Sequence, residues 1–157
     1  LKIKNLDVEG FKVAEIPITY YKNTSLEKAI DYLFVEVDRA HRDGANILIL
    51  TDRGVDENRV PIPSLLAVSA VHQHLVKTKK RTSLAIVLES GEPREVHHFA
   101  TLLGYGASAI NPYLALDTIH QLYDNRHSFE EAMSAGKQMD SIHHIVSLIE
   151  ECVLSKK

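Results

Sequence analysis

Five polar residues follow apolar stretches of strand length, and their types could support acid–base chemistry or ligand binding. They are Asp52, Arg53, Glu89, Ser90 and Asn111. Two carboxylates such as Asp52 and Glu89 can act as general acid and base when their environments separate their pKa values. The same residue types also form ion pairs that only fasten neighbouring loops. The sequence leaves both interpretations open and assigns none of the five a catalytic, cofactor-binding or metal-binding role.

The turn at residues 90–94 could bind an anion, because it combines Gly91 with the start of a predicted helix. Backbone N–H groups at such a turn can hold a phosphate. Two carboxylates, Glu89 and Glu92, flank the turn and would repel it. The chain also has neither a Gly-rich dinucleotide fingerprint nor a Walker loop.

Metal binding and nucleophilic catalysis have weaker support. Three histidine pairs lie at one- or two-residue spacing, whereas two ligands on one helix need a spacing of three or four. These pairs are His72/His74, His97/His98 and His143/His144. The single cysteine, Cys152, lies on a predicted amphipathic helix, where a buried thiol is the usual arrangement.

Alternating strands and helices would position the five rim residues. The apolar patterns predict strands at residues 15–21, 46–51, 83–89 and 107–110, and helices at 24–44, 64–77, 93–104 and 111–123. Such alternation is typical of a mainly parallel α/β sheet with right-handed crossovers. We therefore expect a single domain over residues 1–157 with about four parallel strands and covering helices, either half-barrel-like or doubly wound. The carboxyl ends of parallel strands are where ligands bind in such folds.

Local signals refine these boundaries. Residues 1–15 predict a loose strand or hairpin, and Pro17 confines the strand that follows to an edge. Thr24 with Glu27 has the capping-box pattern of a helix start, and Pro93 is predicted to open a later helix. The helix at residues 64–77 is apolar nearly all round, which predicts burial. A second capping box starts a long terminal helix at residues 128–155.

Composition narrows the class of protein. The chain has 157 residues and a formal net charge of −3, which argues against a nucleic-acid-binding protein. No apolar run approaches the roughly 18 residues that would cross a bilayer. A single cysteine excludes a disulfide framework and fits a reducing compartment. Because the first residue is Leu1 rather than Met, we expect a piece of a longer polypeptide.

Several long motifs resemble one known family. Residues 49–55 read ILTDRGV, and residues 61–68 read PIPSLLAV. Residues 87–100 read VLESGEPREVHHFA, followed by LGYGA at 103–107 and NPYLA at 111–115. These collinear motifs resemble the later part of the central domain of the glutamate synthase large subunit, most specifically over residues 47–122. Residues 137–157 depart from that pattern.

The resemblance implies a connecting domain in a multidomain enzyme that makes glutamate from glutamine and 2-oxoglutarate. Such enzymes are cytoplasmic or plastid proteins, and we expect a cytoplasmic location. In that family an amidotransferase domain releases ammonia, which crosses an internal tunnel to a barrel carrying FMN and an iron–sulfur cluster. The central domain joins the two and helps to wall the tunnel, so the five rim residues are candidates for its wall. Two alternatives remain: a stand-alone half-barrel that binds a small ligand, flavin or phosphate, and an interaction module built on the terminal helix.

Overall fold

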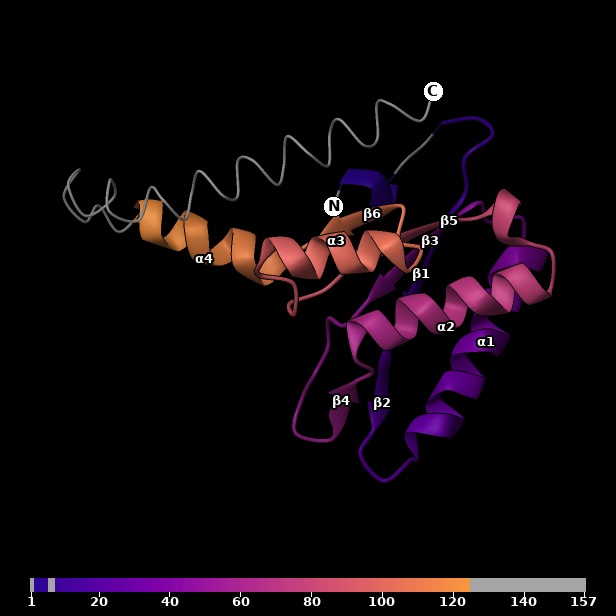
Figure 1. Ribbon diagram of the computed structural model, residues 1–157, viewed down its shortest axis with the longest axis horizontal. Helices are drawn as coiled ribbons and strands as arrows, with labels where there is room; N and C mark the ends of the chain where they lie inside the picture. The colour runs from indigo at the N-terminus through magenta and orange to yellow at the C-terminus, as the bar shows by residue number, and fades with distance from the viewer. Residues whose placement is uncertain (1, 6–7, 125–157) are drawn as a thin grey trace.

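A four-stranded parallel sheet forms the centre of the molecule. The computed structural model describes residues 2–5 and 8–124. The strands β1 (Val13–Pro17), β3 (Ile47–Thr51), β5 (Ala85–Glu89) and β6 (Ala109–Asn111) lie in the order β1-β3-β5-β6 (Figure 1). Spatial order therefore follows chain order, which is the arrangement of a half-barrel rather than of a doubly wound sheet, whose order reverses at a switch point.

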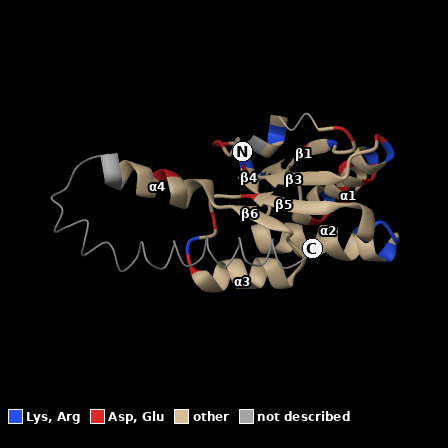
Figure 2. Cartoon of the chain, turned by 90° about the horizontal axis from the view of Figure 1, so that it is seen from above, with Lys and Arg blue, Asp and Glu red and all other residues tan. Residues whose placement is uncertain are grey.

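Three helices cover one face of the sheet. They are α1 (Leu26–Arg42), α2 (Ser64–Lys77) and α3 (Val96–Gly104), each connecting one parallel strand to the next. Figure 2 shows α2 and α3 on one side of the sheet and the N-terminal segment on the other. A fourth helix, α4 (Tyr113–Asp124), follows β6 and projects away from the sheet (Figures 1 and 2).

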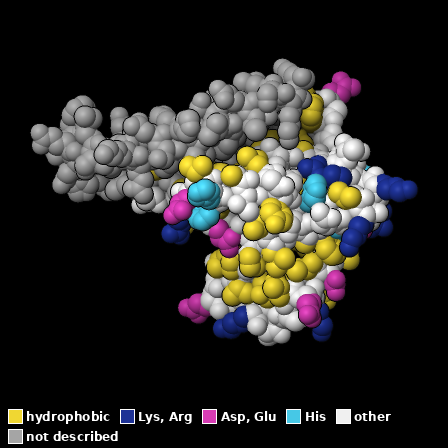
Figure 3. Space-filling model, viewed as in Figure 1, with side chains coloured by type: hydrophobic (Ala, Val, Ile, Leu, Met, Phe, Trp, Pro, Cys, Tyr) yellow, Lys and Arg dark blue, Asp and Glu magenta, His cyan; other side chains and the backbone are white. Residues whose placement is uncertain are grey.

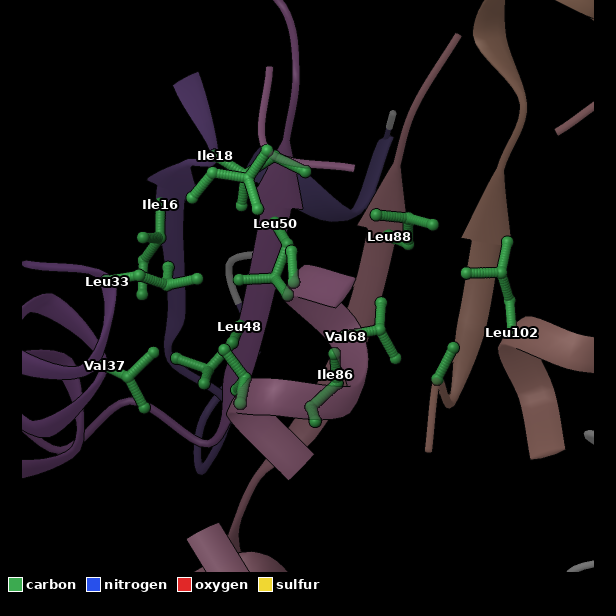
Figure 4. Close-up of a cluster of buried hydrophobic side chains, with 14 of the residues drawn as sticks. Ile16, Ile18, Leu33, Val37, Leu48, Leu50, Val68, Ile86, Leu88 and Leu102 are labelled. Carbon is green, nitrogen blue, oxygen red and sulfur yellow. The ribbon is translucent and has the colours of Figure 1, made fainter. Parts of the chain in front are cut away.

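Side-chain alternation along the strands separates two apolar layers. Leu48 and Leu50 pack with the helices, and Figure 4 shows them close to Leu33 and Val37 of α1. Ile47 and Ile49 face the opposite side, where Ile3 of the short 3-10 helix η1 (Lys2–Asn5) packs against their cluster. All five residues of β3 are buried, as its continuous apolar run predicted.

A two-stranded antiparallel ribbon lies beyond the end of β1. It pairs β2 (Thr19–Tyr21) with β4 (Arg59–Pro61). We expected one strand over residues 15–21, but the chain divides there: the Ile18 N–H donates to Thr51 O, and the Ile62 N–H donates to Ile18 O. Pro17 ends β1, which is an edge strand of the parallel sheet, as its proline predicted.

Several predicted boundaries moved. Helix α1 is capped by Ser25, whose side chain accepts from the Lys28 N–H, so the capping box at Thr24 was wrong by one residue. Helix α3 begins at Val96 rather than Pro93. Residues 2–5 are helical where we expected a loose strand or hairpin.

The helix predicted over residues 64–77 has the bounds that we expected. Its buried residues occupy one side, while Leu65 and Val76 are exposed, so α2 is not buried all round. A short 3-10 helix, η2 (Arg81–Ser83), then leads into β5. The long helix predicted over residues 128–155 lies outside the described residues.

Candidate functional site

The carboxyl edge of the sheet brings the five predicted rim residues together. In the strand register, Glu89 lies between Thr51 of β3 and Asn111 of β6. The next residues continue this alignment, because the Asp52 N–H donates to Glu89 O (3.2 Å) and the Ser90 N–H donates to Asn111 O (3.1 Å). Parallel pairing thus places all five at one edge.

Glu89 is the centre of this network. Its carboxylate is 1% exposed and accepts from four side chains that come from separate parts of the chain. The donors are Lys4 Nζ (2.8 Å), Thr51 Oγ1 (2.8 Å), Arg53 Nε (3.1 Å) and Asn111 Nδ2 (3.3 Å). Lys4 Nζ also lies 3.0 Å from Glu15 Oε1, which links η1 to β1.

The charge on Glu89 is stabilised by these donors. Burial by itself would raise the pKa of the carboxyl group, but the hydrogen bonds from Lys4, Thr51 and Arg53 outweigh it and lower the pKa to about 2. A carboxylate with so low a pKa is a weak base near neutral pH. Glu89 is therefore suited to holding neighbouring segments together.

Asp52 is satisfied in the same way by the turn after β5. Its Oδ2 accepts from Ser90 Oγ (2.6 Å) and from the Gly91 N–H (3.0 Å). Burial and a hydrogen bond with Asp52 raise the pKa of Tyr113 to about 12, so the phenol stays protonated. The β3 and β5 ends are thereby joined to the start of α4.

Arg53 lies at the outer side of the network. Its Nε donates to Glu89, and its guanidinium carbon lies 3.8 Å above the ring centre of Tyr113. The side chain nevertheless remains 48% exposed. A cation over an aromatic face adds to the ion pair in fixing this side chain.

Glu92, which the sequence predicts would repel an anion, is bonded to the start of helix α2. Its Oε2 accepts from the Ser64 N–H (2.8 Å) and from the Ser64 hydroxyl. A carboxylate at the first turn satisfies free N–H groups and interacts favourably with the helix dipole. Helix α2 is thus capped by a residue 28 positions away, because Pro63 offers no side-chain cap.

The backbone N–H groups of the turn at residues 90–94, which the sequence offered as anion donors, are already bonded within the chain. Gly91 and Glu92 donate their N–H groups to Asp52 and to Ser90 Oγ, and Arg94 donates to His98 Nδ1. Ser90 donates to Asn111 O, and Pro93 has no N–H. Since α3 begins only at Val96, the turn does not fit a flavin or nucleotide phosphate.

Two of the three histidine pairs lie in the described part of the chain; His72 and His74 make local contacts, and His97 and His98 are exposed. His72 Nδ1 accepts from Arg81 Nε (3.0 Å), and His74 stacks on Phe34 with ring centres 4.4 Å apart. Among residues 2–5 and 8–124, no group of three His, Cys, Asp or Glu side chains could hold a metal ion. Cys152 and His143/His144 fall outside that part.

Two partners of the rim residues leave no signal in the sequence. Lys4 and Tyr113 reach the network from η1 and α4, and only the fold brings them there. Thr51 had a local signal, because it immediately precedes Asp52 at the end of β3.

In the described residues, none of the helices combines the length and the apolar character that crossing a membrane requires.

The fold and its carboxyl edge define a parallel α/β half-barrel domain whose rim carboxylates are bonded within the chain. The family model described as glutamate synthase central domain matches residues 1–154, past the point where we expected the resemblance to end. The chain belongs to the glutamate synthase central domain family.

Three relatives illustrate the match. The NADPH glutamate synthase large chain of Bacillus subtilis is 51% identical over 112 residues, which is 69% of this chain and 7% of that protein. The NADH glutamate synthase of Saccharomyces cerevisiae is 38% identical over 154 residues, covering 92% and 7%. A ferredoxin-dependent glutamate synthase of Arabidopsis thaliana is 48% identical over 99 residues, covering 62% and 6%. The chain thus spans less than a tenth of each relative.

Proposed function

We propose that this chain is a connecting domain of a glutamate synthase and has no chemistry of its own. In this proposal it joins an amidotransferase domain to an FMN-binding domain of the same polypeptide and helps to wall the path of ammonia between them. FMN and the iron–sulfur cluster belong to the other domains. The single cysteine supports a reducing location such as the cytoplasm.

The observation that carries the proposal is the internal satisfaction of the rim. Glu89 accepts four hydrogen bonds from the chain and has a pKa of about 2, so it offers little basicity. Asp52 accepts from Ser90 and Gly91. Neutral ammonia needs a passage screened from bulk water, and a rigid edge fastened across four segments of the chain supplies such a wall.

The test uses the full-length polypeptide and compares glutamine hydrolysed with glutamate formed. Ser90→Ala removes the hydroxyl that bonds both Asp52 and the Glu92 N–H, which loosens the rim. We expect glutamine hydrolysis to exceed glutamate formation in this variant, because ammonia escapes before it is used. The matched control is Arg94→Gln, an exposed side chain of the same turn.

The control should consume glutamine and form glutamate in equal amounts, like the wild-type enzyme. Equal amounts in Ser90→Ala as well would refute the tunnel-wall role. An Asn111→Ala variant gives a second test, since it removes one donor to Glu89 at the neighbouring strand end. The two variants alter the same rim but remove different hydrogen bonds. If both release more ammonia than they use, the effect belongs to the rim as a whole and not to one contact.

A further inference from the structure

The carboxyl edge buries two of its carboxylates and leaves the side chain of Arg53 exposed. Glu89 and Asp52 are buried with their donors, whereas Glu92 is an exposed residue whose carboxylate is bonded to the first turn of α2. Arg53 is different, because 48% of its side chain is exposed. The network therefore carries three carboxylates and still presents a guanidinium to its surroundings.

Arg53 is held in place before any partner arrives. Its Nε donates a hydrogen bond to Glu89, and its guanidinium carbon lies 3.8 Å from the ring centre of Tyr113. Within residues 2–5 and 8–124, its two terminal nitrogens have no hydrogen-bond acceptor. A pre-ordered guanidinium fork loses little conformational entropy on pairing, and its geometry matches a carboxylate.

Exposed apolar side chains lie at the same edge. They are Val55 after β3 and one residue in the first turn of each following helix, namely Leu65, Val96 and Leu114, all between 37% and 52% exposed. Leu114 lies against the rim turn, since its Cβ is 3.5 Å from the position that a Cβ on Gly91 would take. Figure 3 shows hydrophobic side chains gathered in the region of α2 and the β2–β4 ribbon.

We propose that this edge docks onto another domain of the same longer polypeptide, and that Arg53 pairs there with an aspartate or glutamate side chain. The proposal rests on the proposed function for the existence of that polypeptide. The chain spans 6–7% of the relatives described above, so most of such a polypeptide lies outside it. Apolar contacts around an ordered arginine and tyrosine are typical of interface centres.

Photo-cross-linking in the full-length enzyme identifies the occupant. A benzophenone amino acid replaces Val55 or Leu114, and the control site is Tyr32, an exposed residue of α1. We expect Val55 and Leu114 to link to a peptide outside these 157 residues in the same polypeptide, with an aspartate or glutamate near the link. Links only within the 157 residues, to a second copy, to another protein, or none at all would overturn the proposal.

Hydrogen exchange of the linked peptide then tests the charge pair. We expect Arg53→Gln to accelerate exchange in that peptide at least about tenfold, as loss of an interfacial ion pair does, and Arg53→Lys to accelerate it less. Asn111→Ala is the control for simple loosening, because it also removes a donor to Glu89 but leaves the Arg53 fork. It should leave the partner peptide at the wild-type rate.

Equal acceleration in Arg53→Gln and Asn111→Ala, or no acceleration in Arg53→Gln, would overturn the assignment of Arg53. Neither measurement involves ammonia transfer. The docking proposal can therefore fail while the coupling of glutamine hydrolysis to glutamate formation still depends on the rim. Equally, the edge can dock while that coupling does not depend on the rim.

Discussion

The two edges of the parallel sheet differ in the sign of the charged side chain at the centre of their hydrogen bonds, Glu89 at one edge and Arg81 at the other. At the carboxyl edge the fold encloses the carboxylates of Glu89 and Asp52. At the amino edge it holds Arg81, which donates to Leu84 O (2.6 Å), Gly106 O (2.9 Å) and His72 Nδ1 (3.0 Å). Burial lowers the pKa of His72, and the Arg81 charge adds to this effect, so the neutral imidazole acts as an acceptor.

The difference follows from the common direction of the helices. Parallel strands with crossover helices place every helix N-terminus near the carboxyl edge and every C-terminus near the amino edge. Helix dipoles therefore favour anions at the first edge and cations at the second. Glu92 at the start of α2 and Lys77 in its last turn follow this rule. The direction of the helices thus favours a central carboxylate at the carboxyl edge, where Lys4 and Arg53 are its counterions, and a central guanidinium at the amino edge.

The largest effect is expected at the amino edge, from Gly106→Ala. Gly106 has φ +115°, and an added Cβ would lie 2.3 Å from His72 Nδ1. The new side chain must displace the imidazole and with it an acceptor of Arg81. Backbone strain and the clash together should lower the free energy of unfolding by about 3 kcal/mol, measured by urea denaturation.

The control separates strain from the clash. Adding His72→Ala to Gly106→Ala removes the ring that the new Cβ would strike, so the double variant should lose less than the sum of the two single variants. Additive losses would show that His72 is not the obstacle.

The next largest effect is expected at the carboxyl edge, from Glu89→Gln. Removing the charge of a buried carboxylate leaves Arg53 without its counterion and Lys4 with Glu15 alone, and similar buried pairs cost about 3 kcal/mol when broken. Because the folded-state pKa is about 2 and the ordinary value is 4.5, the stabilisation is fully present above pH 4.5 and is lost as the pH falls toward 2.

The measurement is urea unfolding of the wild-type and variant proteins across that pH range. Their difference in unfolding free energy should shrink between pH 4.5 and 2. Asp38 and Asp56 also have lowered pKa values, but they titrate in both proteins and cancel in the difference. A difference that stays constant with pH would mean that the ion pairs of Glu89 add nothing to stability.

The sequence predicted the parallel sheet and its edges better than the contacts across them. The five rim residues were found because each follows an apolar strand, and strand ends converge whenever the strands are parallel. By contrast, β4 has three residues and pairs with β2, although α1 and β3 separate the two strands in the chain, so no local pattern predicts the pairing. The partner of Asp52 on α4 was equally hidden, because Tyr113 lies 61 positions away.

Helix starts show the same limit. Pro93 has the residue type of a first helical position, but α3 begins at Val96 because the preceding residues serve the rim and α2 instead. The Glu92 carboxylate occupies the start of another helix, a role that depends on tertiary structure and not on neighbouring residues. Here the tertiary contact, and not the local residue preference, determines where the helix begins.

The smallest effect tests the dipole explanation directly, with Glu92→Gln. The variant keeps a side-chain oxygen for the Ser64 N–H but loses the negative charge at the first turn of α2. We expect a loss of about 1 kcal/mol in unfolding free energy at low salt, and a smaller loss at high salt, because the helix dipole is screened by ions. Glu57→Gln is the matched control, since Glu57 is an exposed loop residue outside the helices and should change stability by less than about 0.5 kcal/mol. If the two substitutions cost the same, or if salt has no influence, the opposite charges of the two edges need an explanation other than the direction of the helices.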